Sequence, residues 1–189
     1  MEYLSRRLTD YILKKEIIKK ESYDIYQYGF QCFLELSVST ICSIIIALFL
    51  QMLPEALFFF LLFIPIRSFS GGLHLKNYFS CFLASIFVLI STLLAVKYIT
   101  VPLLISLVVY IFCVILIIAI GPINHPDREV DCDDNHIFKR KTFFTLLFSI
   151  LTAIIFSVMG NTRYMFLQAV LFLFICITAL IGRMLYKHS

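Results

Sequence analysis

The sequence predicts an all-α, polytopic membrane protein with about six transmembrane helices and an amphipathic helix at its N-terminus. Of its 189 residues, 61% are hydrophobic and only 15% are charged. Soluble domains have about 45–50% apolar and about 25% charged residues, so the composition excludes a soluble or disordered chain. The net charge of +4 comes without a basic patch interleaved with aromatic residues, so nucleic acid is not an expected partner.

Residues 1–24 are rich in charge and have no uninterrupted apolar core. Their apolar side chains recur on one side of a helix of period 3.6: Leu4, Leu8, Tyr11, Ile12 and Ile18. Arg7 and Lys14 flank that stripe. The pattern favours an amphipathic helix on the membrane surface. A short solvated helix that caps the bundle fits the same pattern, and the sequence leaves that alternative open.

A bilayer core of about 30 Å needs about 20 mostly apolar residues to cross it. The chain offers six candidate spans, near residues 25–51, 52–66, 77–96, 101–120, 142–162 and 164–182. With the N-terminal helix they form a single membrane domain over residues 1–189. The second span is short and contains Pro65, so a re-entrant second segment with five spans is the alternative.

Positive charge favours six spans with both termini in the cytoplasm. In that arrangement all but two of the 16 Lys and Arg residues lie inside, and only Lys97 and Arg163 lie outside. This asymmetry is what the positive-inside rule expects. It places the segment between the second and third spans, and the loop 121–141, at the cytoplasmic face.

The segment from Arg67 to Cys81 has the residues best suited to chemistry. Gly71 and Gly72 allow the backbone to turn or to be approached closely. His74 and Cys81 follow, seven residues apart, and a straight helix would separate them by a rise of about 10.5 Å. An imidazole must lie within about 3.5 Å of a thiol to activate it. The pair therefore requires His74 to fold back in a partly re-entrant segment.

The start of the third span bears on the reactivity of Cys81. If that helix begins near Asn77, a good N-cap residue, Cys81 falls in its first turn or two. The helix N-terminus and an adjacent imidazolium both favour the thiolate. The pattern thus predicts a Cys–His nucleophile at the cytoplasmic face. The alternative is that Cys81 is a small buried hydrophobic residue and His74 an interfacial hydrogen-bonding group.

With Arg67, Gly72, His74 and Cys81 at these spacings, the chain closely resembles the AgrB (accessory gene regulator protein B) family. The resemblance covers the whole chain in length and span layout, and its specific part is residues 67–81. It implies a bacterial membrane cysteine endopeptidase that removes the C-terminal tail of a small AgrD-like quorum-sensing propeptide and promotes its cyclisation to a thiolactone autoinducing peptide.

The resemblance also implies roles for individual residues. Cys81 would be the nucleophile and His74 the general base, without a metal or another cofactor. Arg67 and Gly72 match motif positions that support the site or handle substrate. Backbone N–H groups around Gly71 and Gly72 are candidates to hold the oxyanion. A small peptide transporter or exporter is the competing function, because an interrupted span beside an intramembrane carboxylate also occurs in transporters.

Two further patterns remain open. Gln27, Gln31 and Glu35 share one face of the first span, either for hydrogen bonds between helices or to orient His74 as part of a triad. A second pair, His125 and Cys132, lies in an acidic loop whose carboxylates disfavour a thiolate. With His136 it could form a metal site, but no known ligand spacing matches. A homodimer is compatible with the sequence.

Overall fold

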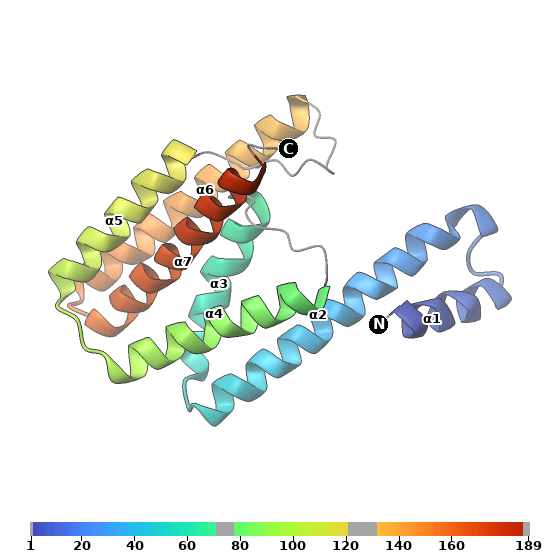
Figure 1. The fold of residues 1–189 in the computed structure, drawn as a ribbon, viewed down its shortest axis with the longest axis horizontal. Helices are drawn as coiled ribbons and strands as arrows, with labels where there is room; N and C mark the ends of the chain where they lie inside the picture. Colours follow the sequence, from blue (N-terminus) through green and yellow to red (C-terminus); the bar gives the residue numbers. More distant parts are fainter. Residues whose placement is uncertain (1, 71–77, 121–131, 187–189) are drawn as a thin grey trace. The chain divides into compact units, whose positions relative to one another are not determined.

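The computed structural model describes the backbone of residues 2–70, 78–120 and 132–186 (Figure 1). The side chains of residues 21, 67–70, 78, 81, 132–139 and 185–186 are outside the description. Within these limits all regular structure is helical, which confirms the all-α prediction. The elements are α1 (Glu2–Lys14), a 3-10 turn η1 (Lys20–Ser22), α2 (Tyr23–Phe49), α3 (Leu53–Ser70), α4 (Tyr78–Tyr98), α5 (Leu103–Ile120), α6 (Cys132–Val158) and α7 (Thr162–Tyr186).

Four of the described helices are long and apolar enough to cross a membrane, which supports a multi-pass membrane protein. The four stretches are Tyr23–Phe49, Leu103–Ile120, Arg140–Val158 and Thr162–Met184. Two shorter apolar stretches, Leu53–Ile66 and Phe82–Tyr98, belong to α3 and α4. At 1.5 Å per residue the complete α3 and α4 are about 27 and about 31 Å long, close to the thickness of a bilayer core. Six spans remain a prediction.

The helix bounds differ most from the expected spans at α6. This helix begins at Cys132, ten residues before the expected start at residue 142, so the second part of the expected loop 121–141 is helical. Carboxylates at Asp133 and Asp134 suit the positive end of the helix dipole there. In α3, Pro65 lies inside the helix, although proline lacks the N–H that a helix interior uses.

The chain divides into two compact units, residues 1–48 and residues 49–189. Unit 1 contains α1, η1 and α2 as far as Leu48. Two residues after the end of α1, Glu16 adopts a left-handed conformation with φ of 56°. The N–H of Glu16 bonds to the oxygen of Leu13 at 3.0 Å, and the N–H of Ile17 bonds to the oxygen of Ile12 at 3.1 Å. These two bonds form a Schellman motif, which turns the chain back toward α2.

In unit 2, α5 and α7 run in the same direction. The ring of Tyr110 on α5 meets that of Phe172 on α7, with centroids 4.9 Å apart. Further along both helices, the thiol of Cys176 donates to the carbonyl oxygen of Cys113 at 3.3 Å. All four residues are almost completely buried. Two successive contacts in the same chain order define a parallel pair.

The helix α6 runs against α7. The amide of Gln168 on α7 reaches Ser149 on α6, and one turn earlier on α7 the sulfur of Met165 accepts a hydrogen bond from Ser157, further along α6, at 3.8 Å. The contacts follow opposite chain order, so the helices are antiparallel. Tyr110 joins this interface, because its hydroxyl and that of Ser149 are 2.7 Å apart. Polar side chains thus connect three apolar helices.

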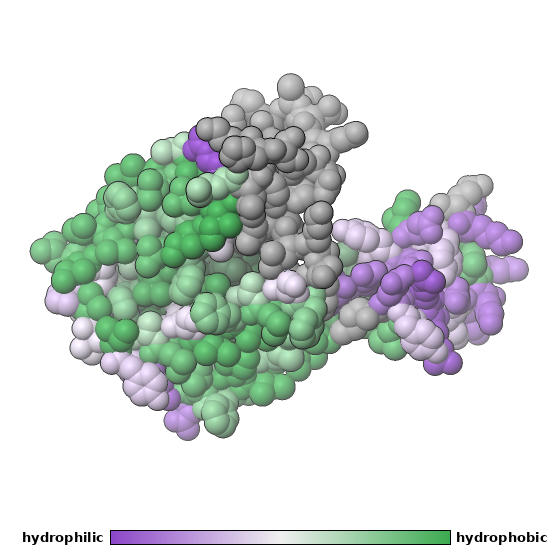
Figure 2. Space-filling model, in the orientation of Figure 1, coloured by the Kyte–Doolittle hydropathy of each residue, from purple (hydrophilic) through white to green (hydrophobic). Residues whose placement is uncertain are grey.

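Outside this core, the described part of the face of unit 2 that Figure 2 shows is largely hydrophobic. Exposed side chains of α5 and α6 include Leu104, Phe112, Ile118, Phe144 and Ile154, each more than half exposed. Soluble monomers rarely expose apolar surface on this scale. The exposed faces are those that lipid would cover.

Candidate functional site

The helix α3, which leads into the segment 67–81, runs parallel to α7. A carboxylate oxygen of Glu55 lies 2.7 Å from a guanidinium nitrogen of Arg163. One turn later on α3, the ring of Phe58 meets that of Tyr164 at a centroid distance of 5.5 Å. Both contacts join the first turns of the two helices. The last residue of α3, Ser70, is therefore at the same end of unit 2 as the end of α7.

The helix α4 returns in the opposite direction. Near its end, the ammonium group of Lys97 donates to the carbonyl oxygen of Leu50, three residues before α3 begins. The start of α4 at Tyr78 must then lie toward the end of α3 at Ser70. We call this end of unit 2 the site end. Because α5 is parallel to α7 and α6 is antiparallel, Ile120 and the start of α6 also belong to the site end.

The predicted nucleophile, Cys81, is the fourth residue of α4. It therefore lies in the first helical turn, where backbone N–H groups lack partners within the helix. The helix begins at Tyr78, one residue after the N-cap expected at Asn77, which lies outside the described residues. The side chain of Cys81 also lies outside the description, so its direction and distance from His74 are not part of the structure.

The other predicted residues of this segment fall on the two sides of residues 71–77. Arg67 lies in the last turn of α3, where its backbone is described and its side chain is not. Gly71, Gly72 and His74 lie outside the described residues. Their assignment as oxyanion holders, support and general base stays a prediction. The second predicted pair also stays untested, since His125 is outside the described residues and only the backbone of Cys132 is described.

Gln31 and Glu35 lie in unit 1, one turn apart on α2. The amide nitrogen of Gln31 donates to a carboxylate oxygen of Glu35 at 3.0 Å, and both side chains are half-buried. Two of the three members of the predicted polar stripe are therefore hydrogen-bonded to each other within α2. Whether Glu35 or Gln31 orients His74 stays a prediction, because His74 lies outside the described residues.

Sequence reasoning missed the charge partners at the end of unit 2 opposite the site end. Glu55 is 7% exposed, yet its carboxylate is paired with Arg163, whose side chain is half exposed. Lys97 is bonded to the carbonyl of Leu50. These are the two basic residues expected outside the cytoplasm, and both have an internal acceptor. The sequence did contain a signal for this ion pair, because Glu55 is the only charged residue in the first turns of an otherwise apolar helix.

The described cysteines outside the predicted site differ in environment. Cys113 and Cys176 are buried at 1% and 2% exposure, whereas Cys32 on α2 is exposed and Cys42 is half-buried. All four are free thiols. Among the residues that the structure describes, no group of three His, Cys, Asp or Glu side chains could hold a metal ion.

Comparison with known proteins gives one result that bears on function. No curated protein and no solved structure matches the chain. The family model described as accessory gene regulator B matches residues 5–181, which is nearly the whole chain. The protein therefore belongs to the AgrB family, membrane peptidases that process the AgrD precursor of a quorum-sensing autoinducing peptide.

Proposed function

We propose that Cys81 and His74 are the nucleophile and general base with which this protein cleaves its AgrD-like propeptide. One observation carries the proposal beyond family membership: α4 begins at Tyr78, so Cys81 occupies a first helical turn. The positive end of the helix dipole stabilises negative charge there, and a thiolate is the reactive form of cysteine. The buried Cys113 and Cys176 have no such position, since both lie within helix interiors. Cys132 also begins a helix, α6, but it belongs to the acidic segment whose carboxylates disfavour a thiolate.

The reaction proceeds as two acyl transfers. The thiolate of Cys81 attacks the carbonyl carbon of the scissile peptide bond, and the C–N bond breaks as protonated His74 gives its proton to the leaving amine. The tail departs with a free amino group, and the remaining peptide is held as a thioester on Cys81. A thiol of that peptide then attacks the thioester carbonyl and gives its proton to His74. The thiolate of Cys81 leaves, and the ring closes as a thiolactone.

The second step exchanges one thioester for another, so bond energies change little. The protein must therefore orient the attacking thiol and keep water from hydrolysing the intermediate. A site at a membrane interface serves both purposes. Glu35 and Gln31 would support His74, while Arg67, Gly71 and Gly72 would bind substrate or its oxyanion.

The site end faces the cytoplasm in this proposal. Its described basic side chains, Arg140, Lys141 and Arg183, are exposed. At the opposite end, Arg163 is paired with Glu55 and Lys97 with the carbonyl of Leu50. An excess of Lys and Arg is characteristic of the cytoplasmic side, and three of the five basic side chains that the structure describes in unit 2 lie at the site end. The propeptide and the catalytic residues would then meet in the compartment where the propeptide is made.

The test is cleavage of a synthetic AgrD-like propeptide by full-length protein in lipid vesicles, followed by mass spectrometry. Cys81→Ala should abolish cleavage, and His74→Ala should slow it by about 10²- to 10⁴-fold. Cys42→Ala, which also removes a cysteine from an apolar helix, is the control and should cleave normally. A propeptide without its own thiol should leave an acyl group on Cys81 or yield a linear product. Cleavage by the Cys81→Ala protein would refute the assignment.

A further inference from the structure

The helix α1 buries two small polar side chains and exposes most of its apolar ones, although Ile12 and Leu13 are half-buried. Ser5 and Thr9 are fully buried, whereas Leu4, Leu8 and Tyr11 are 48%, 38% and 60% exposed. A helix packed onto a soluble bundle has the reverse pattern. The buried hydroxyls incur little penalty because each donates to an oxygen of its own helix, Ser5 to that of Glu2 and Thr9 to that of Ser5, both at 2.9 Å.

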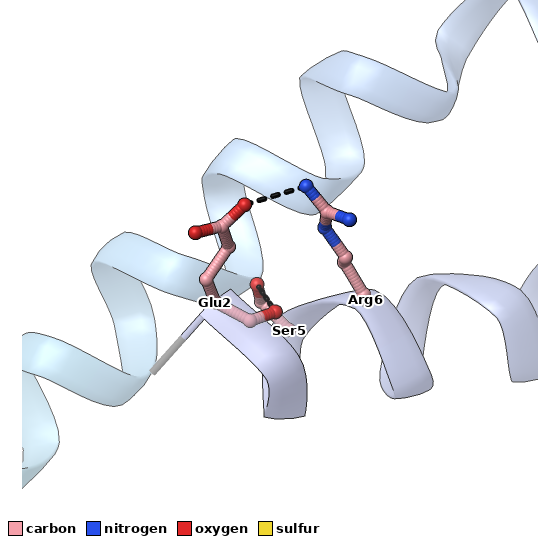
Figure 3. Close-up of polar contacts among 3 residues, drawn as sticks. All are labelled: Glu2, Ser5 and Arg6. Atoms are coloured by element: carbon pink, nitrogen blue, oxygen red, sulfur yellow. Dashed lines mark hydrogen bonds and ion pairs between the residues drawn. The ribbon is translucent and has the colours of Figure 1, made fainter.

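The charged side chains of α1 differ in their position relative to this exposed apolar stripe. On the far side of the helix, the guanidinium of Arg6 is bonded to the carboxylate of Glu2 at 2.5 Å, so these two charges compensate each other (Figure 3). Beside the stripe, the guanidinium of Arg7 lies 5.7 Å from the centre of the Tyr3 ring. Just after α1, the ammonium of Lys15 lies 5.9 Å from the centre of the Tyr11 ring. The stripe thus has aromatic and cationic side chains at its edge.

The position of α1 in unit 1 brings this stripe toward a bilayer. The hydroxyl of Tyr23, the first residue of the candidate span α2, donates to the carboxylate of Asp10 at 2.8 Å. Tyr26 and Tyr28 follow within the next two turns and are exposed at 46% and 71%. Tyrosines gather at the level of lipid headgroups. The contact between Asp10 and Tyr23 therefore holds α1 where α2 enters the membrane.

We infer that α1 docks onto an anionic lipid surface through Leu4, Leu8 and Tyr11, with Arg7 and Lys15 binding the headgroups. An apolar stripe bordered by cations is complementary to acyl chains beneath negative headgroups. This inference does not depend on the catalytic assignment. It selects the membrane-surface alternative for α1 over the helix that caps a bundle.

The test is hydrogen–deuterium exchange of the full-length protein in vesicles of phosphatidylcholine, with and without phosphatidylglycerol. The amides of α1 should exchange more slowly in the anionic vesicles, and the difference should shrink when salt shortens the Debye length. Protection of α2 in the same spectra shows that the protein remains folded. Leu4→Ser with Leu8→Ser should abolish the slow exchange in both lipids.

Two matched variants, each of which removes one positive charge from α1, test the contact with the lipid headgroups. Arg7→Gln should reduce the extra protection in anionic vesicles about five-fold, the effect of one basic residue at a charged surface. Arg6→Gln removes the same charge from the far side and should leave that protection unchanged. Equal protection of α1 in both lipids and in detergent, unaffected by the leucine substitutions, would overturn the inference, because the stripe would then be covered by protein.

Discussion

The side-chain amide of Gln168 on α7 donates hydrogen bonds to the backbone oxygen of Ser149 on α6 at 2.7 Å and to its hydroxyl at 2.9 Å. Gln168 and Ser149 are both completely buried. The carbonyl group of the same amide lies 3.5 Å from the hydroxyl of Thr152. Between helices that are otherwise apolar, such hydrogen bonds determine which helix faces pack together and in which axial register.

We expect Gln168→Leu to lower the free energy of unfolding by about 1 kcal/mol, since the helix keeps its volume but loses its polar contacts to α6. Gln168→Ala should cost about 2–4 kcal/mol because it also leaves a cavity. Unfolding in mixed micelles measures both values. In a double-mutant cycle with Ser149→Ala, additive losses would show that the two side chains do not interact.

The ion pair between Glu55 and Arg163 should respond asymmetrically to substitution. Arg163→Gln leaves a buried carboxylate without its partner and should destabilise the protein by about 1–3 kcal/mol. Glu55→Gln leaves a half-exposed guanidinium that solvent can reach, and should cost less than about 1 kcal/mol. Thermal unfolding of both variants in detergent gives the comparison. Equal losses would contradict the burial of Glu55.

The end opposite the site end should lie outside the cytoplasm. Met159 and Met184 are each 72% exposed, one at the end of α6 and the other near the end of α7. A cysteine at Met159 should react in intact cells with a membrane-impermeant maleimide, and a cysteine at Met184 should react only after the cells are opened. Reversed labelling would mean that the site end faces outward.

Glu16 adopts φ of 56°, a left-handed conformation that disfavours residues with a Cβ atom. Glu16→Gly should therefore stabilise the end of α1 by about 1 kcal/mol, whereas Glu16→Ala keeps the strain and should give no gain. Amide exchange of α1 in detergent measures the difference. Equal exchange in the two variants would indicate that the turn is relaxed.

The sequence was sufficient to predict the helical membrane fold, because long apolar runs between charged residues determine where helices can cross a bilayer. It was insufficient for α6, where Asp133, Asp134 and the following basic residues resemble a solvated loop and yet form helix. Their charges suit a helix terminus as well as they suit solvent, and composition does not separate the two.

Contacts between distant residues were harder to predict than helices. Neither the pairing of Gln168 with Ser149 nor that of Glu55 with Arg163 follows from periodicity, since each depends on which helices pack and at which height. At the candidate site, the start of α4 near Cys81 could be predicted from Asn77, a good N-cap residue. The residue pattern suggested the pairing of His74 with Cys81, and the resemblance to a family assigned His74 as general base, which stays a prediction because His74 lies outside the described residues.

Finally, the reactivity of Cys81 should depend on His74 even without substrate. In vesicle-embedded protein near neutral pH, iodoacetamide should modify Cys81 faster than Cys113 or Cys176, whose thiols are buried within helix interiors. His74→Ala should slow modification of Cys81 while leaving exposed Cys32 unchanged as an internal control. Peptide mass spectrometry distinguishes each cysteine. Modification of Cys81 at the same rate in both proteins would show that the imidazole does not activate the thiol, and His74 would then need another role in processing.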